Sequence, residues 1–446
     1  MWSLVRTTIV ANIGSFFFGV SLVWSSIIGV QIVENEKYKF WITKTQFGIV
    51  VSALSFGAAC SCIISGVVRH SFGTRFTIFI FSSFATIGSI LITVPQNLLM
   101  LIVGRFLLGL AIGSYSFVIP IYIGEISSSE LRGIMLSYFQ IMLNLGILLA
   151  YILGYFVNVN NFNIVCGSIP LFYSIAFLAL PESPVFLVSK GKYDKTHLTM
   201  QLLRGREQNF QPEIASMKEE QTKIEKTSFS ELMKVKCVKK ALIIIMFQFF
   251  CFQLSGANAV TFYAQQIFND AAMNIESSIA AIIVTTFQFI TSVIAVRYIN
   301  LYGRKKMICT FNLFLVLSLM SLGIYFILKD NNYFLIRSLS WLPLLSMCVY
   351  LVTFCLGMGP VTYIWLGELF IQNNAKKTIA PLGQMINHTL TFLIGLFFPL
   401  LTNLIGSGFI FFSFAVVTVI DIIFIILFVP ETNGKTSEEI QNALSR

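Results

Sequence analysis

The stretch from Phe409 to Pro430, FIFFSFAVVTVIDIIFIILFVP, decides the fold class of this chain. It is apolar throughout apart from Asp421, and a helix of this length, rising about 1.5 Å per residue, crosses a hydrocarbon core of about 30 Å. A membrane-spanning β-strand would alternate apolar and polar residues over about 10 positions, and this stretch does not. It therefore predicts a transmembrane helix, whose backbone N–H and C=O groups are paired within the segment itself.

The same apolar character runs through the whole chain. Its 446 residues are 56% hydrophobic and only 11% charged, too few charges to solvate the surface of a water-soluble protein of this size. Polar residues, Gly and Pro separate twelve apolar segments, and the fold class expected is an all-α, multi-pass integral membrane protein of twelve transmembrane helices. The segments lie near 7–31, 46–69, 75–94, 98–122, 132–155, 163–181, 239–268, 276–299, 305–328, 339–367, 378–402 and 407–430.

One long hydrophilic region separates the first six segments from the last six. This linker, 182–238, is rich in charge and is expected to form short surface helices. It divides the chain into an N-terminal six-helix bundle (1–181), the linker, a C-terminal six-helix bundle (239–430) and a tail (431–446).

The positive charges predict which side of the membrane each loop faces. Most of the 30 Lys and Arg residues fall in the linker, the tail and the loops on that same side. Because such residues are retained on the cytoplasmic side, both termini and the linker are predicted to be cytoplasmic. The net charge of +10 then reflects topology, and no nucleic-acid partner is expected. The first apolar segment, from Thr7, is too long for a signal peptide and is interpreted as a retained helix.

Residues that could carry covalent chemistry or hold a metal are sparse. The eight cysteines are scattered, and the closest pair, Cys60 and Cys62, lacks metal-ligand spacing. The three histidines have no acidic partner at a useful spacing. We therefore expect no metal, no cofactor and no enzymatic activity.

Three short patterns occur once in each half of the chain. Two six-helix halves with the same residues at the same membrane face predict a pseudo-twofold axis along the membrane normal. Transporters commonly follow this plan, and their solute site lies between the halves. The patterns are GEI at 124–126 and GEL at 367–369, SFGTR at 71–75 and LYGRK at 301–305, and PES at 181–183 and PET at 430–432.

Longer motifs resemble the sugar porter family of the major facilitator superfamily over essentially the whole chain. They are GRFLLGLAIG at 104–113, PIYIGE at 120–125 with LRG at 131–133, QLSGANAV at 253–260, GMGP at 357–360 and PETNGKTSEEI at 430–440. Among subfamilies, Trp24-Ser25-Ser26 and the short amino terminus look most like the insect facilitated trehalose and hexose transporters. The resemblance implies the major facilitator fold and facilitative sugar transport.

A sugar presents hydroxyl groups that both donate and accept, so its site should offer uncharged amides and aromatic rings. Amides are scarce inside apolar helices and are expensive there without partners. By resemblance, Gln140, Gln253 and Asn258 match sugar-binding positions of the family. The alternative is that they only bond neighbouring helices. Since an unbroken helix would not turn both Gln253 and Asn258 inward, a break is expected at Ser255-Gly256.

Further site positions depart from the family pattern. Gln288 stands where the family commonly has Asn, Tyr363 where many members have Trp, and Asn387 is the expected contact in the eleventh segment. Phe252 and Cys355 replace a Gln and a Glu that often bind hexose, which leaves the particular sugar open. Gln248, one turn before Phe252, could compensate.

Charged pairs at the cytoplasmic ends are expected to gate the pathway. By resemblance, Arg75, Glu125 and Arg132 serve one half, and Arg304, Glu368 and Lys376 serve the other. Gly256 and Pro360 would permit helix movement. Arg residues usual after the second and sixth segments are missing, and Val185 occupies one of their places. We therefore predict a weak gate, and with it either an inward-facing bias or slower transport than in related carriers, since only a network of exposed pairs has an appreciable effect.

The expected function is uniport of a hexose or a trehalose-like disaccharide by alternating access. Ser21 replaces the Asp of the family's proton symporters, so Arg105 is read as an anchor and no proton coupling is expected. The alternatives are a non-transporting sugar sensor and a carrier for a charged solute. We expect a monomer in the plasma membrane whose partners are the sugar and the lipid bilayer.

Overall fold

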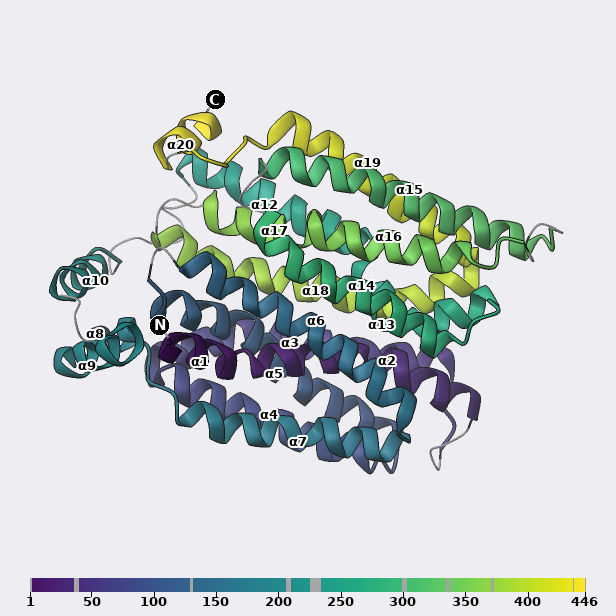
Figure 1. Ribbon diagram of the computed structural model, residues 1–446, viewed down its shortest axis with the longest axis horizontal. Coiled ribbons are helices and arrows are strands. Elements are labelled where there is room, and N and C mark those ends of the chain that lie inside the picture. Colours follow the sequence, from purple (N-terminus) through teal and green to yellow (C-terminus); the bar gives the residue numbers. More distant parts are fainter. Residues whose placement is uncertain are drawn as a thin grey trace.

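The computed structural model describes residues 2–35, 40–128, 131–205, 210–224, 234–298, 303–333, 336, 338–369, 373–435 and 437–445, and these contain helices and no strands. Twelve helical segments are long and apolar enough to cross a membrane, as predicted. Figure 1 shows them as two stacks of roughly parallel helices, α1–α7 below and α12–α19 above.

The first half contains the first six spans. They are α1 (Trp2–Ala11) with α2 (Ile13–Asn35), α3 (Lys44–Phe72), α4 (Thr74–Thr93), α5 (Leu98–Ile126), α6 (Arg132–Phe156) and α7 (Val159–Leu178). The second half contains α12 (Lys236–Leu254) with α13 (Ala257–Ala271), α14 (Ser277–Tyr298), α15 (Arg304–Asp330), α16 (Leu342–Leu356) with α17 (Met358–Glu368), α18 (Asn373–Ile405) and α19 (Ser407–Phe428).

Among the described residues, three short helices between the halves and one after them lie at one end of the bundle, together with both chain ends (Figure 1). They are α8 (Pro184–Ser189), α9 (Tyr193–Arg204), α10 (Gln211–Ile224) and α20 (Ser437–Ser445). We call this the linker end and the opposite one the distal end. Arg204 fixes α9 to the first half, because its guanidinium donates to the carbonyls of Ile126 and Ser127 and pairs with Glu213 at 2.7 Å.

The seventh span is broken where the sequence predicted a break. Helix α12 ends at Leu254, Gly256 adopts a left-handed conformation with φ +90°, and α13 follows. A Cβ at Gly256 would meet the ring of Phe414 at 2.5 Å, so both the backbone and the packing require glycine. The hydroxyl of Tyr350 donates to the freed carbonyl of Ser255 at 3.0 Å, which satisfies a polar group inside an apolar bundle.

Among the described residues, the two halves meet mainly along α3 with α18, α6 with α14 and α2 with α13. Two hydrogen bonds bridge α2 and α13 in their distal parts. Ser25 Oγ donates to the carbonyl of Phe262 at 3.1 Å, and the N–H of Gln265 donates to Ser26 Oγ at 3.0 Å. The distal end is therefore closed by direct contact between the halves.

Candidate substrate-binding site

A chain of polar side chains joins the broken seventh span to α18. Gln253 Nε2 donates to Asn387 Oδ1 at 2.6 Å, and Asn258 Nδ2 donates to Gln253 Oε1 at 2.6 Å and to Thr391 Oγ1 at 3.2 Å. Asn387 Nδ2 extends the chain to the hydroxyl of Tyr363 at 3.2 Å. The break at Gly256 makes this possible, since it turns Gln253 and Asn258 toward each other although five residues separate them.

A second set of amides bridges the two halves. Gln140 Nε2 from α6 and Gln288 Nε2 from α14 both donate to Asn144 Oδ1, at 3.3 and 3.2 Å. Asn144 Nδ2 in turn faces Cys355 Sγ of α16 at 4.0 Å. Because Asn144 is buried and bonded across the interface, the amide of Gln140 faces the other half and not lipid.

Aromatic rings lie beside the first set. Phe252, which stands where the family often has Gln, packs against Phe354 at 5.1 Å and Tyr363 at 6.0 Å between ring centroids. Gln248 does not compensate for it, which corrects the sequence expectation. Its Nε2 instead donates to Oδ2 of the buried Asp421 of α19 at 3.4 Å.

The structure gathers all six predicted binding residues into these two sets, with Gln253, Asn258, Tyr363 and Asn387 in the first and Gln140 and Gln288 in the second. Sequence reasoning missed Asn144 and Thr391. Each lies four residues after a predicted residue, on the same helix face, and that spacing was the signal available. All the groups in both sets are amides, hydroxyls or a thiol, so the arrangement suits an uncharged guest rich in hydroxyl groups.

Access to these groups differs along the pathway. Gln253 and Asn387 are buried, whereas Tyr363 is 39% exposed and Gln140 is also exposed. Both exposed residues lie in the linker-end part of their spans. The exposed members of the two sets therefore lie nearer the linker end, and the contacts of Ser25 and Ser26 lie nearer the distal end.

At the linker end of the first half, Glu125 pairs with Arg69 at 2.5 Å and accepts a hydrogen bond from Ser183. Arg69 was not predicted. The predicted Arg75 donates its guanidinium to the carbonyl of Leu178, and Arg132 Nε donates to the carbonyl of Gly124 at 3.1 Å.

The second half repeats the pattern. Arg304 pairs with Glu368 at 3.3 Å and also bonds Asn433. The side chain of Lys376 lies outside the described residues. Pro360 sits in the first turn of α17, directly after the interruption at Gly357 that divides the tenth span.

Two glutamates show the internal repeat at atomic detail. Glu182 accepts from the backbone N–H groups of Thr74 and Arg75 at 3.0 and 3.2 Å. Glu431 accepts from those of Arg304 and Lys305 at 2.9 and 3.1 Å. A carboxylate at a helix N-terminus compensates both the unpaired N–H groups and the helix dipole. The same device in both halves supports their descent from one repeated unit.

Twelve spans in two similar halves, with uncharged polar groups at their interface, define a major facilitator-type membrane transporter. The chain belongs to the family described as "Sugar (and other) transporter", whose model matches residues 7–444. The resemblance seen in the sequence is therefore confirmed.

Individual proteins with similar sequences are also sugar transporters. The chain is 29% identical over 448 residues to the facilitated trehalose transporter Tret1 of Aedes aegypti, covering 100% of this chain and 55% of that one. It is 30% identical over 451 residues to Tret1 of Bombyx mori, covering 100% and 87%. The chain spans about half the length of most of these curated relatives.

Solved structures confirm the fold. The partially occluded, inward-open conformation of the xylose transporter XylE from E. coli superposes with a TM-score of 0.81 at 21% identity, covering 98% of this chain and 100% of that one.

Proposed function

We propose that this protein is a uniporter that carries a sugar, a hexose or a trehalose-like disaccharide, across a membrane by alternating access. The observation that carries the proposal is the chain of hydrogen bonds from Asn258 through Gln253 to Asn387. The printed functions of the insect relatives support a sugar, and among them a disaccharide. No covalent step is proposed, and the protein is not an enzyme.

The amides bond one another in this structure, and a sugar would exchange those bonds for its own. Each hydroxyl both donates and accepts, so it can enter between Gln253 and Asn387 without leaving either amide unpaired. An apolar solute could not do this, because unpaired buried amides cost about 1–3 kcal/mol each. A charged solute would need a counter-ion, and the two sets of side chains described above contain none.

The contacts between the halves support an inward-facing state. The hydrogen bonds that Ser25 donates and Ser26 accepts join the halves at the distal end, while the pairs Arg69–Glu125 and Arg304–Glu368 each stay within one half. We take the linker end as cytoplasmic, with both termini there, the plasma membrane as the location and the monomer as the working unit.

Downhill uniport follows from the uncharged site. Ser21 provides no carboxylate beside Arg105, and the amide sets hold no group that exchanges a proton at neutral pH.

Tracer uptake into proteoliposomes tests the function. The purified chain is expected to accumulate labelled trehalose or D-glucose to equilibrium and to discriminate against L-glucose, which has the same composition. Binding is measured in parallel on the same preparation. Binding without uptake would assign the chain to sugar sensing, and neither binding nor uptake across a panel of hexoses and disaccharides would refute the proposal.

A further inference from the structure

Arg105 is a buried cation with few partners. It lies in α5 with 0% of its surface exposed, and its Nη1 donates to the backbone carbonyl of Ser21 at 3.0 Å. Its guanidinium carbon lies 4.8 Å from the centre of the Trp24 ring. Among the described residues, Nε and Nη2 have no hydrogen-bond partner although both are buried. Two strong donors are thus left over.

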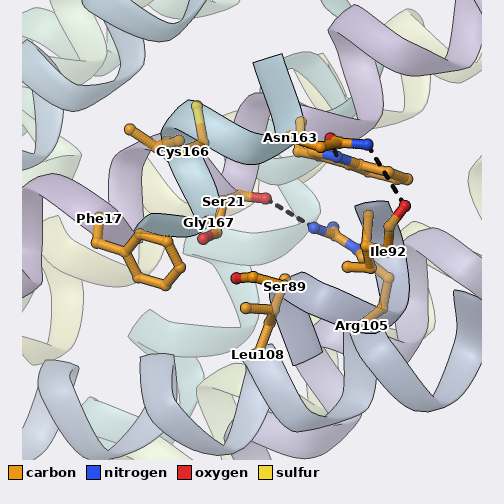
Figure 2. A pocket seen from close by; sticks show the side chains of 11 residues that line it. Phe17, Ser21, Ser89, Ile92, Arg105, Leu108, Asn163, Cys166 and Gly167 are labelled. Carbon is orange, nitrogen blue, oxygen red and sulfur yellow. Dashed lines mark hydrogen bonds between the residues drawn. The ribbon is translucent and has the colours of Figure 1, made fainter. Parts of the chain in front are cut away.

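The side chain of Arg105 lines a small cavity inside the first half (Figure 2). Side chains from α2, α4, α5 and α7 line this cavity, and Figure 2 shows the guanidinium of Arg105 among them. The lining includes Ser21 and Trp24 from α2, Ser89 from α4 and Asn163 from α7. It is separate from the amide sets between the halves.

The polar atoms around the cavity are already engaged with one another. Asn163 Oδ1 accepts from Trp24 Nε1 at 2.8 Å, its Nδ2 faces the carbonyl of Ile92 at 3.4 Å, and Ser89 Oγ donates to the carbonyl of Ala85 at 2.8 Å. Among the described residues, these atoms therefore offer no hydrogen-bond acceptor to Nε and Nη2 of Arg105.

No acidic residue lines the cavity. Of the four helices that enclose it, α4 and α7 contain no Asp or Glu, and the acids of α2 and α5 lie at their ends, at Glu34 and Glu125. Among the described residues that line the cavity, Arg105 therefore has no acidic counter-ion.

A guanidinium in a lipid-shielded interior is costly unless its charge is compensated. One carbonyl and one aromatic face compensate it partly. A water molecule could accept from Nε or Nη2, but it would bring no charge. A small anion would accept these hydrogen bonds and also compensate the positive charge. Hydrogen bonds between a cation and an anion are stronger than those between neutral groups.

We propose that this cavity binds a small monovalent inorganic anion of the chloride class, held by Nε and Nη2 of Arg105. The free space in the cavity, about 20 Å³, is too small for a sugar or a lipid. The anion would tie α2 to α4, α5 and α7. Since Ser25 lies one turn beyond Ser21 on α2, occupancy would also stabilise the helix that closes the distal end.

Thermal unfolding of the purified full chain tests the proposal. The midpoint is measured in sodium chloride or sodium bromide against sodium gluconate at equal ionic strength, since gluconate is too large to enter. A ligand that binds only the folded state stabilises it in a saturable manner. The expected result is a rise of a few degrees that saturates with chloride or bromide.

Three variants locate the effect. Ser21→Asp places a carboxylate on α2 facing Arg105 and is expected to abolish the chloride response, as is Arg105→Gln. The exposed Arg6→Gln is expected to retain it. If Arg105→Gln does not fold, Ser21→Asp alone decides the test. An anomalous bromide peak within about 3.5 Å of Arg105 in crystals would be the direct view.

Either of two results would overturn the proposal. The wild-type midpoint could be the same in chloride and gluconate, or Ser21→Asp could respond to chloride as strongly as the wild type, which would place the anion elsewhere.

Discussion

Gln253 donates to Asn387 at 2.6 Å, and this bond connects the broken seventh span to the eleventh near the middle of both. The bond exists because α12 stops at Leu254 and Gly256 redirects the chain. The geometry of the site therefore depends on the helix break.

Replacing Gly256 with alanine tests the break. The left-handed conformation costs a residue with a Cβ about 1–2 kcal/mol, and the contact with Phe414 at 2.5 Å adds to it. Gly256→Ala is expected to lower the unfolding midpoint and to slow uptake. The control is Gly133→Ala, because a Cβ there meets nothing within 4 Å in a helix. Equal midpoints for the two variants would contradict the prediction.

A double-mutant cycle tests which arginine serves Glu125. The Arg69 and Glu125 side chains are only 19% and 17% exposed, and their nitrogen–oxygen distance is 2.5 Å. Arg69→Gln and Glu125→Gln are expected to be coupled in stability by about 1 kcal/mol or more. Arg132→Gln and Glu125→Gln should be additive, because Arg132 bonds the Gly124 carbonyl. Stronger coupling to Arg132 than to Arg69 would show that the pairing is wrong.

The distal closure can be weakened selectively. Ser25→Ala with Ser26→Ala removes both hydrogen bonds between α2 and α13, each of which is worth about 0.5–1.5 kcal/mol. Spin-label distances across the distal ends should lengthen in a larger fraction of molecules. Ser83→Ala, which loses only a bond within α4, serves as the control. An unchanged distance distribution in the double variant would argue against these bonds as the closure.

Uptake should not depend on a proton gradient. The amide sets contain no carboxylate, and Ser21 provides none beside Arg105. Initial rates in proteoliposomes are expected to stay the same when an ionophore removes the gradient at clamped membrane potential. A collapse of uptake would show that proton coupling had been missed.

The sequence was sufficient to predict the twelve spans and the break in the seventh. Length and apolar character set the twelve spans, and the spacing of Gln253 and Asn258 demanded the break that Gly256 supplies. The pairing of charges was harder to foresee. Arg69 and Glu125 meet because α3 and α5 pack side by side, with a close approach at Gly109 and Gly113 further along the two helices. Such a crossing is set by packing and not by motif spacing.

The role of Gln248 shows the same limit. Gln248 lies one turn before Phe252 and could have compensated for the missing amide. Its contacts, however, depend on which helix packs against that face of α12. In α12 that neighbour is Asp421 of α19, which also accepts from Asn312 Nδ2 at 2.9 Å. Asn144 was missed because its partners Gln288 and Cys355 come from distant segments.

Equilibrium binding of the transported sugar to Gln253→Ala tests the central claim most directly. Loss of this amide removes the link between Asn258 and Asn387, and a lost hydrogen bond of about 1–3 kcal/mol corresponds to roughly 5- to 150-fold in affinity. Calorimetry on the purified variant should show a fall of that size, while Gln201→Ala on α9, far from the interface, should bind as the wild type does. Wild-type affinity in Gln253→Ala would contradict the account.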